Sequence, residues 1–293
     1  MEILFVGGAE RSGPSALGAA LGAHPHYAEL PVEAGFHCEP RGLAGLLEGR
    51  VRLSGFLDEL RGRWWERTDG GGGLAQVIDG EAFEAAAERF AASFHDDPVP
   101  ACRTLFAALI GPWMERSGRP CLVEHTPRVV WRAQTLSRLF PDALFVHALR
   151  DGREVAGAIA AESGADGRPG EGIDRWVERL RAIDAGARGE EDGARYDIGG
   201  DKLTAVVVDD LASGAPEPAA DLAGFLGPGA AGIERDLGGR LRAAVPESGA
   251  WRLRLGRMRC ARVDRRYGRA LTALANEHNH AAPPLLAAFR REA

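Results

Sequence analysis

The chain has 293 residues, of which 45% are hydrophobic and 27% are charged. This apolar share supports a sizeable folded core and excludes a chain that is disordered throughout. Its 36 basic and 42 acidic residues give a formal net charge of −6, so no global field draws the protein to nucleic acid or to an anionic membrane. No apolar run reaches the roughly 18 residues that a membrane span requires.

The four cysteines are scattered and form no C-x-x-C pair. This spacing favours a reduced protein of the cytoplasm and argues against a disulfide framework or a structural zinc site. The chain starts without the basic segment and the long apolar run of a secretory signal, which favours the same location. Lys202 is the only lysine, so any mechanism that needs a lysine depends on this residue.

Strand and helix patterns alternate along the chain. Residues 3–7 form an apolar run that ends in glycines, which predicts a buried strand, and Pro14 suits the first turn of a helix over Pro14–Gly22. The same patterns predict strands at Cys121–Glu124, 143–149 and 203–208, and helices at 129–140, 153–161 and 172–187. This alternation predicts an α/β fold with a doubly wound parallel sheet.

The stretch 31–117 interrupts this alternation, because its pattern is mostly helical. The predicted helices are Leu43–Leu47, 54–65, 81–94 and 103–116. We interpret 31–117 as a helical insertion that forms an acceptor pocket or lid, within a single domain over 1–293. Trp64 and Trp65 in this stretch suit either a buried core or an aromatic acceptor.

An arginine-rich helix is predicted at 257–269. One of its faces carries Arg262, Arg265, Arg266 and Arg269, and another carries Val263, Tyr267, Leu271 and Leu274. We interpret it as a surface helix with a solvated basic side, and binding of an anionic ligand by one arginine is the alternative.

The loop between the first strand and the first helix has the pattern of an anion site. Glycines let residues 8–15 turn tightly, and the N–H groups and dipole of a helix start attract an anion. The spacing matches the phosphate loop G-x-x-x-x-G-K-[ST], except that Pro14 occupies the lysine position. A conventional nucleotide triphosphatase or kinase is therefore disfavoured, and Arg11 supplies the charge in this loop. A turn without a ligand is the alternative.

A second basic residue follows a predicted strand directly. Arg150 comes after the strand at 143–149, and ligands of doubly wound sheets bind at the carboxyl ends of strands. A guanidinium there suits a phosphate, which it binds through two hydrogen bonds. Arg153, one helical turn later, is expected to be a solvated or structural charge.

Several segments, in this order, resemble the sulfotransferase family. GGAERSGPSALGAAL resembles its 5′-phosphosulfate loop, and LFVHALRDGREVAGAI resembles its 3′-phosphate motif. VEHTPRVVWRAQTLSRLFPDA resembles the segment between them, while VVVDDLASGAPEPAADLAGFLG and SGAWRLRL resemble later parts. The bacterial relatives of the tyrosylprotein sulfotransferase branch are most similar. The resemblance leaves out 31–117 and implies a sulfotransferase-like fold of phosphate-loop type.

The resemblance implies transfer of a sulfonyl group from 3′-phosphoadenosine 5′-phosphosulfate (PAPS) to a hydroxyl of a small metabolite, natural product or glycan, without a metal. The residues that would hold the 5′-phosphosulfate are Arg11, Ser12, Gly13, Pro14 and Ser15, and Arg150 would bind the 3′-phosphate. Relatives carry a hydroxyl residue where this chain has Pro14, and a serine where it has Ala158. Glu10 adds a negative charge beside the loop.

Two further residues are candidates for the chemistry. In relatives, a glutamate shortly after a His-Pro pair acts as the base that deprotonates the acceptor. Glu33 fits that spacing better than Glu29. His37 is the reserve base. His125 stands where many relatives have a lysine near the leaving oxygen, and a strand-end histidine with a structural role is the alternative.

Two other functions remain open from the sequence. A kinase-like phosphotransferase is one, since Asp209 follows a strand as a magnesium-binding aspartate would. A non-catalytic nucleotide-binding relative is the other. A metal enzyme is least favoured, because the pairs His24-x-His26 and His278-x-His280 show no partners near them in the sequence.

Overall fold

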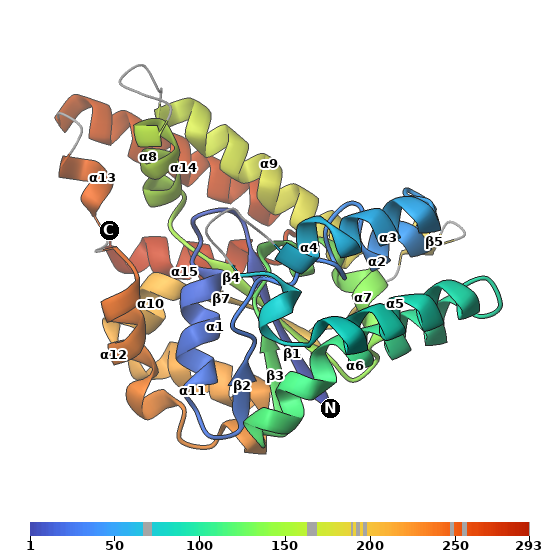
Figure 1. Ribbon diagram of the computed structural model, residues 1–293. Coiled ribbons are helices and arrows are strands. Elements are labelled where there is room, and N and C mark those ends of the chain that lie inside the picture. Colours follow the sequence, from blue (N-terminus) through green and yellow to red (C-terminus); the bar gives the residue numbers. More distant parts are fainter. Residues whose placement is uncertain are drawn as a thin grey trace.

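The computed structural model of the protein describes residues 1–66, 72–162, 169–188, 190–191, 194–195, 198–246, 249–253 and 257–292. Five parallel strands form its central sheet, in the order β2-β3-β1-β4-β7 (Figure 1). The bounds are Glu2–Gly8 for β1, Tyr27–Glu29 for β2, Cys121–Glu124 for β3, Leu144–Leu149 for β4 and Leu203–Val207 for β7. The predicted parallel α/β sheet is confirmed. The sequence does not predict β2, because three residues are too few to show a period.

Helices cover both faces of this sheet. The first face carries α1 (Pro14–Gly22), α10 (Val208–Ser213), α11 (Pro216–Leu226) and α12 (Glu234–Ala244), with the 3₁₀ turn η3 (Pro228–Ala230). Leu4 and Val6 of β1 pack toward these helices, whereas Phe5 between them packs in the core of the opposite face. This is the alternation that a two-residue strand period imposes.

The second face is covered in two parts. Over the ends of β4 and β7 lie α8 (Gly152–Glu162), α9 (Pro169–Ala187), α13 (Ala250–Leu253), α14 (Arg257–Asn276) and α15 (Ala282–Glu292). The predicted faces of α14 are confirmed, because Val263, Tyr267, Leu271 and Leu274 are buried whereas Arg262, Arg265, Arg266 and Arg269 are exposed. A small antiparallel pair joins β5 (Glu190–Glu191) to β6 (Ala194–Arg195).

The other part of the second face is formed by the helices of the 31–117 stretch. They are α2 (Leu43–Leu47), α3 (Leu53–Arg61), α4 (Arg63–Glu66), the 3₁₀ turn η1 (Leu74–Gln76), α5 (Gly80–Ser93) and α6 (Pro98–Ser117). Figure 1 shows α3 to α6 projecting from one side of the sheet. Trp64 is 2% exposed, so its expected place in the core is confirmed.

Two predicted helices are interrupted: 54–65 breaks at Gly62, between α3 and α4, and 129–140 is α-helical only in its second half. Residues 129–140 divide into the 3₁₀ turn η2 (Pro127–Arg132) and the helix α7 (Ala133–Leu139). Val129 and Val130 of η2 pack against the backbone of Gly7, where a Cβ would lie 2.7 Å from Val129 Cγ2. Close tertiary packing therefore sets the tighter turn, which the helical period of the sequence does not reveal. No helix among the described residues is long and apolar enough to cross a bilayer.

Candidate active site

The 8–15 loop joins β1 to α1 at the carboxyl end of the sheet. Gly8 lies so close to β4 that a Cβ there would overlap Ser12 Oγ and the carbonyl oxygen of Ala148. Gly13, with a φ of 85°, takes the left-handed conformation at the N-cap of α1, and Arg11 has a φ of 66°. The tight turn expected from the glycines is confirmed. It leads into the first turn of α1, whose N–H groups lack acceptors within the helix.

Glu33 lies beside that first turn. Its carboxylate accepts a hydrogen bond from Ser15 Oγ at 3.2 Å. The backbone of its segment is held to β3, since the Leu30 N–H donates to the Val123 carbonyl at 2.9 Å and the Gly35 N–H donates to Thr126 Oγ1 at 3.3 Å. A residue predicted as the base and a residue predicted to hold the donor are thus in direct contact.

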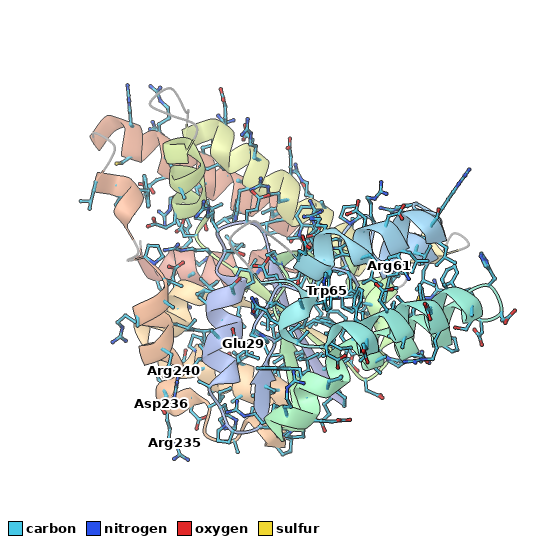
Figure 2. All side chains as sticks on the ribbon, viewed as in Figure 1. Glu29, Arg61, Trp65, Arg235, Asp236 and Arg240 are labelled. Carbon is cyan, nitrogen blue, oxygen red and sulfur yellow. The ribbon has the colours of Figure 1, made fainter. Side chains whose placement is uncertain are left out.

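His125 directly follows β3 and packs against α1. Its Nε2 lies 3.3 Å from the Glu29 carboxylate, on β2 (Figure 2), and a Cβ on Gly18 would lie 2.7 Å from His125 Cβ. Burial lowers the pKa of His125, but the hydrogen bond to Glu29 and the charges of Glu124, Glu29 and Glu33 outweigh it, so the pKa is raised. His125 Nδ1 is buried and has no hydrogen-bond partner among the described residues.

A buried pair lies behind these groups. His37 Nε2 is 3.1 Å from the Glu124 carboxylate, and neither side chain is more than 1% exposed. Glu124 also accepts hydrogen bonds from the backbone N–H and hydroxyl of Thr126. Burial raises the pKa of Glu124, but His37 and these hydrogen bonds outweigh it and lower the pKa. His37, the reserve base, is thus buried in the core and paired with Glu124, whereas Glu33 lies beside the first turn of α1.

Arg150 lies at the end of β4, on the other side of the 8–15 loop. Its side chain is 9% exposed, with Nε 3.3 Å from Asp209 Oδ1 and Nη2 donating to the Pro246 carbonyl at 2.7 Å. The residue before Pro246, Val245, lies near Gly13, where a Cβ would be 3.7 Å from its Cγ1. The segment that holds Arg150 thus also borders the start of α1.

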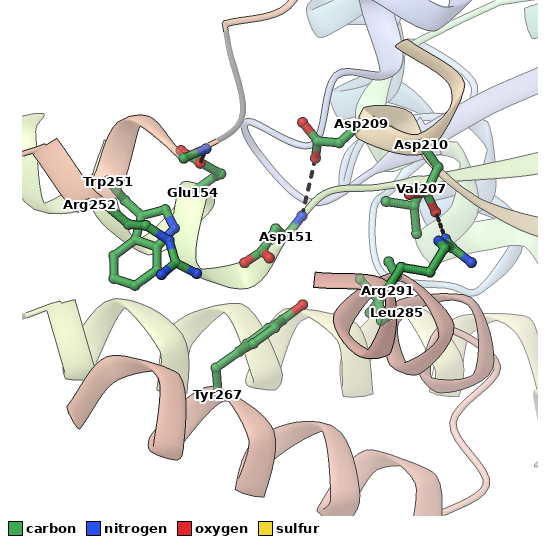
Figure 3. A pocket seen from close by; sticks show the side chains of 12 residues that line it. Asp151, Glu154, Val207, Asp209, Asp210, Trp251, Arg252, Tyr267, Leu285 and Arg291 are labelled. Atoms are coloured by element: carbon green, nitrogen blue, oxygen red, sulfur yellow. Dashed lines mark hydrogen bonds and ion pairs between the residues drawn. The ribbon is translucent and has the colours of Figure 1, made fainter. Parts of the chain in front are cut away.

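A cavity of about 430 Å³ opens beyond the ends of β4 and β7. Figure 3 shows its charged and aromatic walls: Asp151, Glu154, Asp209, Asp210, Trp251, Arg252, Tyr267 and Arg291. Three of its carboxylates bind arginines, since Asp151 binds Arg153, Asp209 binds Arg150 and Asp210 binds Arg291. Burial, helped by the charges of Asp151 and Asp209, raises the pKa of Glu154. The cavity therefore carries less uncompensated negative charge than its number of carboxylate residues suggests.

Arg153 braces the wall of this cavity. Its side chain is 2% exposed and lies between Asp151 and Asp264, whose Oδ1 is 2.6 Å from Nη1. Its guanidinium also lies over the rings of Trp251 and Tyr267, at 5.4 and 4.9 Å from their centroids. Of the two expectations for Arg153, a solvated charge is wrong and a structural charge is confirmed.

Two charged residues with sequence-based expectations, Glu10 and Lys202, have partners outside the 8–15 loop. Glu10 binds Arg179 at 2.8 Å, so its negative charge is paired. Lys202 contacts the Pro141 carbonyl and immediately precedes β7, at the opposite end of the sheet from the 8–15 loop. The single lysine therefore cannot replace the missing lysine of a phosphate loop.

Both histidine pairs contact residues that are distant from them in the sequence. His26 Nε2 lies 3.3 Å from the Glu2 carboxylate, near Cys121. His280 lies 2.7 Å from the Asp184 carboxylate and 2.8 Å from His147. These contacts join positions about 25 to 130 residues apart, so only the folded topology brings them together.

Comparison with known proteins places the chain in a family. The family model described as "Sulfotransferase family" matches residues 4–213. Similar solved structures include the sulfotransferase domain of the Synechococcus PCC 7002 olefin synthase, with 16% identity over 87% of this chain and 82% of that chain, and a TM-score of 0.42. Sulfotransferase STF1 from Mycobacterium tuberculosis H37Rv has 17% identity over 91% of this chain and 76% of that chain, and a TM-score of 0.45. No curated protein matches significantly. Since the family model matches more than half of the chain, the protein belongs to the sulfotransferase family.

Proposed function

We propose that the protein transfers a sulfonyl group from PAPS to a hydroxyl group. The acceptor oxygen attacks sulfur and loses its proton to a carboxylate, while the bond from sulfur to the 5′-phosphate oxygen breaks. The products are a sulfate ester, adenosine 3′,5′-bisphosphate and one proton. Such an in-line transfer depends mainly on positioning and charge neutralisation.

The 8–15 loop and Arg150 are the proposed donor site. The start of α1 offers N–H donors and the positive end of the helix dipole to the phosphosulfate. Arg11, Ser12, Gly13, Pro14 and Ser15 form this loop, although Pro14 has no N–H and Ser12 Oγ is used by the Ala9 carbonyl at 2.7 Å. Arg150 is nearly buried, which strengthens its attraction for a phosphate relative to an arginine in water.

Glu33 is the proposed base, and its contact with Ser15 is the observation that carries the proposal. This contact holds the carboxylate beside the helix start at which the sulfonyl group would lie. His125 is the proposed donor to the leaving oxygen. Its Nε2 is fixed by Glu29, and its unpartnered Nδ1 carries a proton in the charged form that the raised pKa favours.

A kinase-like phosphotransferase is less well supported. Its phosphate loop needs a lysine, and Lys202 lies at the other end of the sheet. Asp209, the candidate magnesium ligand, instead binds Arg150.

The acceptor is proposed to be a small metabolite, natural product or glycan that enters beside the 31–117 helices. The similarity to the tyrosylprotein branch stays a prediction from the sequence.

Transfer of radiolabelled sulfonyl from PAPS to a panel of hydroxylated acceptors tests the proposal. The wild type is expected to label at least one acceptor, and Glu33→Gln is expected to lower kcat by on the order of 10²–10⁴. Glu84→Gln is the matched control, because Glu84 is exposed on α5, where it binds Arg61. Donor binding without turnover by the wild type on every acceptor would instead indicate a non-catalytic relative.

A further inference from the structure

Three potential metal ligands meet at the end of the sheet opposite the 8–15 loop. Glu2 is the first residue of β1, Cys121 is the first residue of β3, and His26 immediately precedes β2. One ligand atom from each lies within 4.8 Å of the other two. Strand β1 has seven residues, so this cluster lies about 20 Å from the loop at the far end of the strand.

The backbone holds these residues in place. Glu2 pairs with Cys121 in the register of β1 and β3, and the Cys121 N–H donates to the His26 carbonyl at 3.3 Å. The His26 ring lies edge-on against Tyr27, with 5.0 Å between centroids and an interplanar angle of 88°. Sheet pairing and ring packing thus hold the backbone of the three residues and the His26 ring in place before any ion binds.

The spacing of the His26 and Glu2 ligand atoms suits a tetrahedral ion. His26 Nε2 and Glu2 Oε2 are 3.3 Å apart, and two ligands at about 2.0 Å from a tetrahedral zinc ion are separated by about 3.3 Å. The side chains become more exposed outward, from the buried Cys121 through His26 to Glu2, whose side chain is 69% exposed. An ion can therefore reach the cluster from solvent, and a water molecule can complete its coordination.

We propose that Glu2, His26 and Cys121 bind a divalent ion of the zinc type. A thiolate, an imidazole and a carboxylate together select a borderline ion such as Zn²⁺, whereas Mg²⁺ and Ca²⁺ require oxygen ligands. Binding replaces the thiol proton, which is released to solvent. The ion would join the starts of three strands, so its effect is expected on stability and not on the sulfonyl-transfer step.

Cobalt binding, measured by absorption, tests the proposal independently of activity. With any polyhistidine tag removed, the wild type is expected to bind one Co²⁺, which Zn²⁺ displaces, and to show a thiolate-to-cobalt charge-transfer band in the near ultraviolet. Cys121→Ser should abolish the band, and His26→Gln should weaken binding at least tenfold. Cys260→Ser and His95→Gln are the controls, because Cys260 is the more accessible thiol and His95 is an exposed histidine.

The test remains decisive if Cys121→Ser fails to fold. Glu2 is exposed, so Glu2→Gln leaves the core intact and should weaken binding of Co²⁺ several-fold. Zn²⁺ should also raise the melting temperature of the wild type and not that of His26→Gln. The proposal is overturned if the wild type shows no thiolate band, if the band persists in Cys121→Ser, or if binding is equal in His26→Gln, Glu2→Gln and the controls.

Discussion

Ser15 Oγ, on the first turn of α1, donates a hydrogen bond to the Glu33 carboxylate at 3.2 Å. This contact joins the phosphate-loop side of the site to the side on which an acceptor hydroxyl would be deprotonated. Under the proposed function, Ser15 would release the carboxylate and donate to an oxygen of the incoming 5′-phosphate. In the proposed mechanism, this contact would link donor binding to the freedom of the base.

We predict that Ser15→Ala weakens binding of adenosine 3′,5′-bisphosphate by up to about tenfold. The loss of one hydroxyl donor costs about 0.5–1.5 kcal/mol. Calorimetric titration of the nucleotide measures the effect. Ser54→Ala on α3 is the control and should bind the nucleotide like the wild type, and equal affinities in both variants would contradict a role for Ser15.

The raised pKa of His125 predicts a pH dependence. If the charged imidazole assists the leaving oxygen, kcat falls as pH rises through this pKa, which lies above the ordinary value of about 6.5. The stabilisation that Glu29 gives to charged His125 is present below the unfolded-state pKa and is lost as pH rises through the folded-state pKa. Glu29→Gln should move the alkaline limb to lower pH. Rate profiles with NMR titration of the imidazole measure this, and an unmoved limb would exclude His125 as its source.

The buried pair of Glu124 and His37 is expected to stabilise the fold, so a substitution that breaks it should lower stability. Glu124→Gln should lower the free energy of unfolding by about 1.5–3 kcal/mol, because a charge-assisted hydrogen bond in the core is lost. Since the pKa of Glu124 is lowered in the folded state, its contribution is present above the unfolded pKa of about 4.3 and disappears as pH falls through the folded value. Denaturant unfolding at pH 7 and at acidic pH checks this. Glu84→Gln should change stability by less than about 0.5 kcal/mol.

Two glycine-to-alanine changes within helices separate packing from helix propensity. Gly239→Ala on α12 should stabilise the protein by about 0.5–1 kcal/mol, since no atom lies within 4 Å of the added Cβ. Gly18→Ala on α1 should instead displace His125, because the new Cβ would lie 2.7 Å from its Cβ. Unfolding midpoints and kcat measure both changes. Normal activity in Gly18→Ala would show that the position of His125 does not matter.

The sequence predicts those parts of the molecule that depend on local pattern. The parallel sheet, the helix over Pro14–Gly22 and the buried stripe of α14 follow from apolar periods and from glycine and proline positions. The sequence cannot show that Arg150 binds Asp209, or that His37 binds Glu124, because these contacts join residues 59 and 87 positions apart. The family spacing selects Glu33 as the base candidate, but its place beside Ser15 depends on where β3 and Thr126 hold the 30–35 segment.

The central claim is that the 8–15 loop and Arg150 bind the same nucleotide. Calorimetry with three nucleotides tests it most directly. The wild type should bind adenosine 3′,5′-bisphosphate more tightly than adenosine 5′-monophosphate or ATP with magnesium. Arg150→Ala should lose roughly 10- to 150-fold in affinity for the bisphosphate alone, as expected for a charged hydrogen-bonding partner. Arg240→Ala, on α12 (Figure 2), is the control. A wild type that binds the monophosphate as tightly as the bisphosphate, or an Arg150→Ala variant that keeps the preference, would contradict the proposed donor site.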